Sequence, residues 1–281
     1  MTNLDDIIKK FSFKLKYLKS HLKVFFLPRN VFAYLVKSKQ GDFLIDPKDL
    51  SVGRSLLKYR EYGNDEINNV INLAGKKANI LFIGAHIGAI AIPVAKAVNK
   101  VTAIEANPST FLLLKLNALL NECKNLNLIQ LAAGEKDGYI KFVQNTANSG
   151  GSKRMPIIKA INFFYDKPKI IKIKMKRLDD LINEKFDLIF IDIEGSEYFA
   201  LQGMQKLLSS SSHLIIEYIP DHLKKVSNAL PSDLLKLISP HFHNLYIPSL
   251  KKTVRRSQFS RALNDMFRLN QSDNGIIFSK K

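Results

Sequence analysis

The sequence is poor in cysteine, acidic residues and uninterrupted apolar runs, and each shortage narrows the class of protein. Its 281 residues include one cysteine, Cys123, which excludes an internal disulfide and suits a reducing compartment. No stretch approaches the roughly 18–20 consecutive apolar residues of a membrane-spanning helix. The first residues also lack a secretory pattern, because Asp5 and Asp6 come first and lysines interrupt the apolar positions. These absences predict a cytoplasmic protein.

The shortage of acids leaves a large positive charge. Against 25 Asp and Glu stand 43 Lys and Arg, for a net charge of +18. This balance favours anionic partners, meaning nucleic acid, a membrane surface or an acidic or phosphorylated substrate. The lysines are widely scattered, however, as on any lysine-rich solvated surface, and they are denser only in residues 9–29 and 251–261. The charge alone therefore selects no partner.

Residues 4–26 have the spacing of an amphipathic helix that ends at Pro28. Lysines lie mostly on the faces away from the apolar stripe. The stripe can pack on the rest of the protein, or it can lie in a membrane interface with its lysines at anionic head groups. The apolar positions that recur at three- and four-residue steps are Leu4, Ile7, Ile8, Phe11, Leu15, Leu18, Leu22 and Phe25.

From Lys77 onward, short apolar runs alternate with helical patterns, which is typical of βαβ units and a parallel sheet. We expect residues 75–281 to form a Rossmann-like α/β domain, mostly parallel with an antiparallel C-terminal edge, and residues 1–74 to form the amphipathic helix and a small α/β extension. Strands are expected at 79–83, 101–105, 126–131, 139–143, 170–175, 188–192 and 213–218 and in "HNLYIP" and "NGIIFSK", and helices at 64–75 and about 87–98, 108–122, 178–183 and 196–209.

The first candidate site follows the strand at 79–83. In "ILFIGAHIGAIAIPVAKA", Gly84 permits a tight turn, and Gly88 lets the start of the helix, with its free N–H groups, approach a ligand. Glu105 ends the next strand, where an acid accepts hydrogen bonds from both ribose hydroxyls of a nucleotide cofactor. The third glycine of G-x-G-x-x-G is missing. This disfavours NAD and leaves S-adenosylmethionine as the favoured cofactor.

The second candidate site is "IDIEGSEYFALQGMQKLL". Asp192 and Glu194 follow the strand at 188–192, at the carboxyl edge where open α/β sheets bind ligands. Glu197 lies in the first turn of a helix, where an acid equally well complements the helix dipole. For a general base, Asp192 is the first candidate, Glu194 the second and Glu217, which ends the next strand, the third.

The six histidines show no metal-binding spacing. None form H-x-x-x-H, and no Cys/His cluster is present. His241-Phe242-His243 alone is more typical of a polar strand edge than of a ligand pair. The sequence therefore predicts no metal site.

Several of these segments together resemble the FkbM family of methyltransferases. They are "IGAHIGAIAIPVA", "VTAIEANPSTFLLLKLNALLN", "LIQLAAGEKDG", "NSGGS", "LDDL", "DLIFIDIEGSEYFALQGMQKLL" and "LIIEY". The resemblance covers about residues 78–220, and the D-x-E-G-x-E hexad at 192–197 is its most specific element. It implies a class I methyltransferase sheet, S-adenosylmethionine as donor, and usually methyl transfer to the oxygen of a sugar or natural-product hydroxyl.

The resemblance also assigns residues to parts of the site. It implies a donor-binding loop, a second-strand acid with its turn, an adenine-side loop and a loop over the active site. The donor-binding loop is Gly84, Ala85, His86 and Gly88, and the second-strand acid with its turn is Glu105, Ala106 and Asn107. The adenine-side loop is Ala133 and Gly134, and the loop over the active site is Asn148, Ser149, Gly150 and Gly151.

The chain departs from the family pattern at three positions. Phe82 and His86 replace the usual Asp and Asn of the donor loop, and Ala106 replaces a Pro. Loss of the Asp removes a polar group near the methionyl end of the donor, so donor affinity is expected to fall. Hydrogen bonding by His86 could compensate.

The acceptor is expected to be a saccharide hydroxyl of a glycan or glycoconjugate. Residues 145–153 are rich in Asn, Ser and Gly, which suit sugar hydroxyls, and basic residues there and at 251–261 could hold an acidic glycan. Two alternatives stay open. The net charge and "KKTVRRSQFSR" favour an RNA methyltransferase, although no RNA-binding motif is present. Phe82 favours a membrane-recruited binding protein, at the inner membrane face, that kept the fold and lost catalysis.

Overall fold

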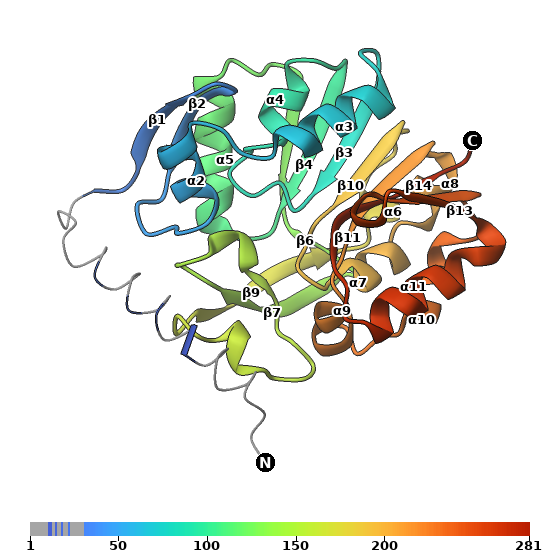
Figure 1. Ribbon diagram of the computed structural model, residues 1–281. Coiled ribbons are helices and arrows are strands. Elements are labelled where there is room, and N and C mark those ends of the chain that lie inside the picture. The colour runs from blue at the N-terminus through green and yellow to red at the C-terminus, as the bar shows by residue number, and fades with distance from the viewer. Residues whose placement is uncertain (1–10, 13–14, 16–17, 19–21, 23–30) are drawn as a thin grey trace.

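A computed structural model describes residues 11, 12, 15, 18, 22 and 31–281 (Figure 1). An eight-stranded sheet crosses this part of the chain in the order β13-β12-β14-β11-β10-β3-β4-β5. The neighbours from β11 to β5 are parallel, whereas β11, β14, β12 and β13 pair antiparallel, which confirms the predicted mostly parallel sheet with an antiparallel C-terminal edge. The bounds are β3 Asn79–Ile83, β4 Lys100–Glu105, β5 Leu126–Gln130, β10 Leu188–Ile191, β11 His213–Tyr218, β12 Asn244–Ile247, β13 Lys252–Arg255 and β14 Asp273–Ser279.

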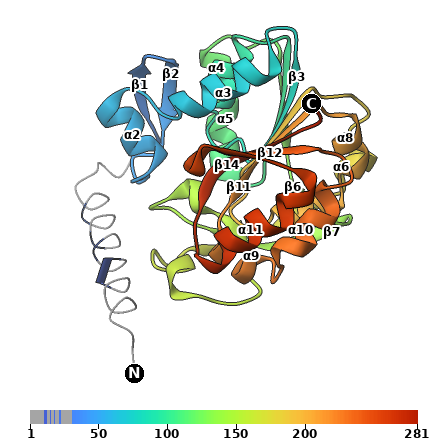
Figure 2. The ribbon, with the colours of Figure 1, turned by 45° about the vertical axis from the view of Figure 1, so that its right-hand side comes forward.

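Helices cover both faces of this sheet, which explains why its central strands are continuous apolar runs. In β3, Ile80 and Phe82 contribute to one core, while Leu81 and Ile83 contribute to the core on the other face. The first core packs against α3 Asn64–Ala74, α4 Ala91–Ala95 and α5 Pro108–Leu120. The second packs against α7 Glu197–Gln202, α8 Gln205–Ser210, α10 Pro231–Ile238 and α11 Phe259–Arg268, with the short α6 Leu178–Leu181 and α9 Pro220–Val226 beside them (Figures 1 and 2).

Two expected helices differ from the prediction. The segment at 87–98 is helical only from Ala91 to Ala95, because the preceding turn has positive φ at His86 and Gly88 and is not helical. The segment at 196–209 is two helices, interrupted after Gln202. A side chain at Gly203 would collide with the carbonyl oxygen of Gly134. The next helix, α8, begins where the Asp179 carboxylate accepts the backbone N–H groups of Lys206 and Leu207.

A second, four-stranded sheet adjoins the first in the order β6-β9-β7-β8, where β6 is Ala132–Ala133. Its long strands, β7 Gly138–Gln144 and β9 Lys169–Lys176, pair antiparallel and correspond to the two extra strands expected from the sequence. Between β7 and β8 Lys153–Arg154 lies a loop that contains the 3-10 turn η1 Ser149–Gly151. This loop is the one that the family resemblance places over the active site.

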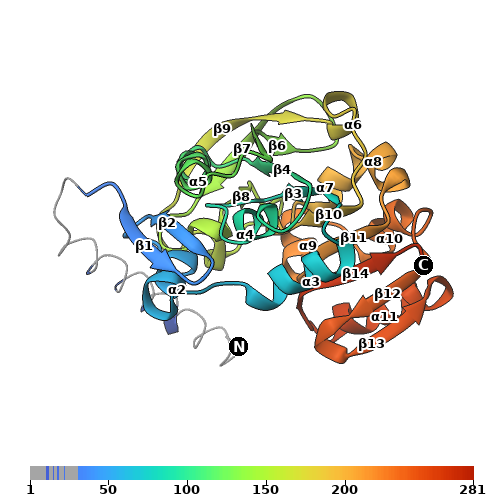
Figure 3. The same cartoon turned by 90° about the horizontal axis from the view of Figure 1, so that it is seen from above.

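The extension before the eight-stranded sheet contains the hairpin β1 Tyr34–Ser38 and β2 Gly41–Ile45, followed by α2 Val52–Tyr59. Figure 3 shows it at the opposite end of the molecule from β13. Phe43 and Leu56 are fully buried and share a core with Ile92 and Leu113 of the main domain. The boundary predicted after residue 74 stays a prediction, and α3, on its N-terminal side, packs its Ile67 and Val70 against the main sheet.

Most of the amphipathic helix expected at 4–26 lies outside the described residues. Of its stripe, Phe11, Leu15, Leu18 and Leu22 are described; each is helical, and their exposed fractions range from 43% to 70%. Among the described residues, no helix combines the length and the apolar content that crossing a membrane requires.

Candidate active site

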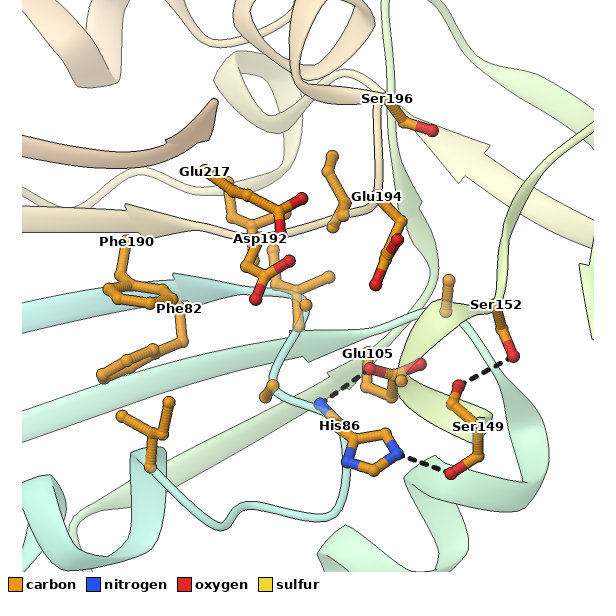
Figure 4. A pocket seen from close by; sticks show the side chains of 18 of the residues that line it. Phe82, His86, Glu105, Ser149, Ser152, Phe190, Asp192, Glu194, Ser196 and Glu217 are labelled. Atoms are coloured by element: carbon orange, nitrogen blue, oxygen red, sulfur yellow. Dashed lines mark hydrogen bonds between the residues drawn. The ribbon is translucent and has the colours of Figure 1, made fainter. Parts of the chain in front are cut away.

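A pocket of about 240 Å³ opens at the carboxyl ends of β3, β4, β10 and β11 (Figure 4). This is where parallel strands direct their following loops, and ligands of open α/β sheets bind there. Both candidate motifs contribute to its wall. The loop after β3 forms one side, and the acidic segment after β10 forms the side opposite.

The loop after β3 is held in shape by its glycine and by the acid of the next strand. Gly84 has φ of +93°, and a Cβ there would collide with the backbone carbonyl of Asp192. The Glu105 carboxylate accepts the backbone N–H of His86 at 2.8 Å and that of Asn107 at 2.7 Å. Glu105 is thereby fixed with its carboxylate in the pocket wall, as a ribose-binding acid needs.

His86 links three segments of the chain at the edge of the pocket. Its Nε2 lies 2.7 Å from the Ser149 hydroxyl of the loop over the site, and Ser149 donates a hydrogen bond to the Asp49 carboxylate of the extension. Since the one proton of Ser149 goes to Asp49, Nε2 of His86 carries a proton and donates to Ser149. His86 therefore bonds the loop over the site, and the predicted compensation for the missing Asp on the donor side stays a prediction.

The opposite wall is a cluster of acids around one buried lysine. Asp192, Glu194 and Glu217 all line the pocket, and in Figure 4 the side chains of Asp192 and Glu217 approach each other. The ammonium of Lys153, which is 5% exposed, lies 2.9 Å from Glu194 Oε2. It also lies 4.7 Å from the centre of the Phe163 ring. Lys153 is thus paired inside the site, so it is not a free basic group for an acidic glycan.

Burial and neighbouring negative charges raise the pKa values of two acids in this cluster, Asp192 and Glu217. Desolvation, with the nearby Glu194 carboxylate, raises the pKa of Asp192 well above its ordinary value. Desolvation and then Asp192 raise the pKa of Glu217 in the same way. The Lys153 ammonium opposes both shifts. Carboxyl groups with raised pKa in a pocket wall are stronger bases than ordinary ones, which suits proton acceptance from a hydroxyl.

Glu197 has a different task in the same hexad. Its Oε1 accepts the backbone N–H groups of Ile193 and Gly195, at 3.0 and 3.2 Å, and so fixes the turn that carries Glu194. It is 5% exposed, and burial raises its pKa to about 7 against those two hydrogen bonds. Glu197 is therefore a structural residue of the turn, in keeping with the alternative that the sequence left open.

The pocket brings together most of the residues that the sequence singled out. Those that line it are Gly84, Ala85, His86, Glu105, Ala106, Ala133, Asn148, Ser149, Gly150, Asp192, Glu194 and Glu217. Four others support the wall from behind. Asn107 caps α5 and bonds Ser152, a Cβ on Gly88 or Gly134 would collide with neighbouring side chains, and Gly151 closes the η1 turn by donating to Asn148.

Sequence reasoning missed Asp49 and His222, which lie outside the quoted motifs and have no periodic signal. It counted Lys153 among the basic residues for an acidic glycan, whereas the structure pairs this lysine with Glu194. His222, from α9, lies 3.4 Å from Glu194 and 4.0 Å from Glu217. Burial and the Lys153 ammonium lower its pKa to about 4, so its imidazole is neutral at pH 7.

Phe82 gives the pocket an apolar wall where the family pattern has an acid. It is 2% exposed, and its ring lies 5.2 Å from that of Phe190 on the adjacent strand. Both rings line the pocket beside Asp192 (Figure 4). The departure from the family pattern thus puts an aromatic surface where a carboxylate is usual.

Comparison with known proteins gives one strong match. The family model described as "Methyltransferase FkbM domain" matches residues 83–246, a segment that includes nearly all of the pocket residues named above. Among curated proteins, none matches the chain.

Several solved structures are similar at low identity. An FkbM methyltransferase from Methylobacillus flagellatus is 17% identical over 72% of this chain and 43% of its own, with a TM-score of 0.40. A TehB-like SAM-dependent methyltransferase from Corynebacterium glutamicum is 13% identical over 81% and 94%, with a TM-score of 0.44. A SAM-dependent methyltransferase from Agrobacterium tumefaciens is 8% identical over 89% and 70%, with a TM-score of 0.45. The chain thus spans less than half the length of the first of these.

Proposed function

The chain belongs to the FkbM methyltransferase family, with S-adenosylmethionine as its cofactor, and we propose that it methylates a hydroxyl oxygen of a saccharide acceptor. The observation that carries the proposal is the half-buried carboxyl cluster in the pocket wall. Asp192 and Glu217 face the cavity opposite the loop that Glu105 holds in place. A donor side and a proton-accepting side therefore share one pocket.

The residues present fit the cofactor. Glu105 offers a fixed carboxylate to the ribose hydroxyls, and the apolar Leu131, Ala132 and Phe142 line the pocket where an adenine ring needs a flat surface. Asp192 and Glu194 supply negative charge for the amino and sulfonium groups. When bound, S-adenosylmethionine supplies a methyl group that is already activated by its positive sulfur.

The chain's own contribution is binding, alignment and control of the acceptor proton. Asp192 is the first candidate to accept that proton, because it lies at the end of β10 in the pocket wall and its pKa is raised. Lys153 favours its ionised form. Holding the reactants in line contributes up to about 7–11 kcal/mol, and a positioned base a further ~10²–10⁴-fold.

A second hollow of about 310 Å³ extends the pocket and supports a saccharide acceptor. It shares Glu66, Phe190 and Asn274 with the first. Asp65 and Asn69 add carboxylate and amide groups at its rim, which suit hydroxyl donors, and the apolar floor suits the C–H face of a sugar ring. The uncharged sugar fits this acidic rim better than the anionic glycan or RNA suggested by the net charge.

The proposal is tested by the transfer of labelled methyl groups into fractionated cell extract. Label should enter glycan fractions when the protein and labelled S-adenosylmethionine are both present, and it should be absent without the protein. Label in RNA and none in glycan would replace the proposal with the RNA methyltransferase. Donor binding without any transfer would favour the inactive binding protein.

Asp192→Asn provides the matching test of the base. The amide keeps the shape of the side chain but cannot accept the proton, so turnover should fall by roughly 10²-fold or more. Donor affinity, measured by calorimetry, should change by much less. A turnover within a factor of about three of the wild type would pass the role to Glu194 or Glu217.

A further inference from the structure

Three side chains beside the donor pocket present metal-ligand atoms to a common centre. Glu194 follows β10, Glu217 belongs to β11, and His222 belongs to α9. One carboxylate oxygen of each glutamate and a ring nitrogen of His222 all lie within 4.8 Å of one another. The topology therefore brings residues from three elements, up to 28 positions apart in the sequence, to a single point.

The distances fit ligands around one ion better than direct pairing. His222 Nδ1 lies 3.4 Å from Glu194 Oε2 and 4.0 Å from Glu217 Oε2. The atom is buried, and no described residue forms a hydrogen bond with it. Ligand atoms at about 2.1 Å from an ion lie ~3 Å apart when adjacent and ~4.2 Å apart when opposite. The observed separations lie close to that range and exceed ordinary hydrogen-bond lengths.

The cluster has more carboxylates than cations, which favours the binding of a further cation. Asp192, Glu194 and Glu217 share the positive charge of Lys153, and burial without enough countercharge is costly for carboxylates. Lys153 also lies over the ring of Phe163, so its ammonium keeps a favourable contact if Glu194 takes another partner. A lone ammonium accounts for one of the carboxylates and leaves the buried Nδ1 of His222 unsatisfied.

We propose that Glu194, Glu217 and His222 bind a divalent cation of the Mn²⁺ type. Two carboxylates favour a hard cation, and the imidazole favours a transition metal over Mg²⁺ or Ca²⁺. Three protein ligands leave coordination positions open toward the pocket, which Glu194 and Glu217 both line. This inference rests on the proposed function, in which the acceptor hydroxyl would occupy one of these open positions beside Asp192. This departs from the sequence-based expectation of no metal.

The test is a calorimetric titration of the metal-free, full-length protein with Mn²⁺ alone. We expect one ion per chain and a rise in melting temperature on saturation. Glu217→Gln and His222→Asn should each weaken binding by about tenfold or more, since each removes one ligand. Asp180→Asn removes an exposed acid of α6 and should leave the affinity unchanged.

The outcome is distinguishable from failure of the proposed function because S-adenosylmethionine binding is measured on the same preparations. No Mn²⁺ binding by the wild type, or binding that both variants retain, would overturn the metal site even if the donor binds. Mn²⁺ binding that both variants lose would support the site even if no glycan accepts methyl groups. Retained melting temperatures of the metal-free variants show that they are folded.

Discussion

At the scale of single residues, the pocket contains backbone conformations that the sequence does not reveal. His86 and Glu194 have φ of +52° and +57°, in the left-handed region that non-glycine residues rarely adopt. Each such residue costs on the order of 1 kcal/mol, and the fold retains both where they face the pocket. The conformation aims the His86 ring at Ser149 and the Glu194 carboxylate at Lys153.

Glu105→Gln tests the donor side at this scale. The amide keeps the size of the side chain but loses the charge that strengthens hydrogen bonds to the ribose hydroxyls and to the N–H groups of His86 and Asn107. S-adenosylmethionine affinity should therefore fall by up to about 2 kcal/mol. Calorimetric titration measures it, with the exposed Glu122→Gln as control. Unchanged affinity in a folded Glu105→Gln protein would remove the basis for placing the ribose there.

At the scale of elements, strands were more predictable than helices. The central strands lie within one residue of their predicted bounds because both of their faces are buried, which makes each an uninterrupted apolar run. The helices α10 and α11 were missed, and the break at Gly203 depends on contact with Gly134, far away in the chain. The acids at strand ends were predictable from topology. His222 reaches the site only through the packing of α9, which no local pattern encodes.

The first turn of α7 makes stability depend on pH. Burial raises the pKa of Glu197 from 4.5 to about 7, so the folded protein holds this proton more tightly than the unfolded chain. The resulting stabilisation is present below the unfolded pKa and is lost as pH rises through about 7. Glu197→Gln keeps an oxygen for the N–H groups of Ile193 and Gly195 and cannot ionise. The Glu197→Gln protein should therefore lose less stability than the wild type between pH 5 and 8.

The measurement is the free energy of unfolding in urea at several pH values between 5 and 8. The wild type and Glu197→Gln should diverge as pH rises, by on the order of 1–3 kcal/mol at pH 8. Glu122→Gln, whose side chain is exposed, should follow the wild-type curve. Parallel curves for wild type and Glu197→Gln would show that this carboxyl does not titrate in the folded protein above its unfolded pKa.

At the scale of the whole molecule, the positive charge and the acidic site are separated. The pocket wall holds Asp192, Glu194 and Glu217, whereas Lys252, Arg255 and other basic residues at 251–261 are exposed around the edge strand β13. The net charge of +18 is thus carried in part by exposed residues away from the pocket, whereas Lys153 and Arg154 lie at the pocket itself. It can bring the protein to an anionic surface without setting the charge of the acceptor.

The N-terminal segment is where such a surface contact should form. Its described apolar residues Phe11, Leu15, Leu18 and Leu22 are 43–70% exposed, so they do not have the burial that packing on the catalytic domain would give. Of the two outcomes left open by the sequence, we therefore expect membrane association. Burying this stripe in an interface gains about 0.8 kcal/mol per CH₂, and each nearby lysine adds ~1 kcal/mol at an anionic surface.

Co-sedimentation with vesicles tests this expectation. The full-length protein should pellet with vesicles rich in phosphatidylglycerol and not with pure phosphatidylcholine, and removal of residues 1–30 should abolish pelleting without changing donor affinity. Leu18→Asp with Leu22→Asp should act like the truncation, while Leu119→Asp, which alters a leucine of α5 that is 68% exposed, should pellet normally. Equal pelleting of the full-length and truncated proteins would move the membrane contact to another basic surface, of which the edge around β13 is the first candidate.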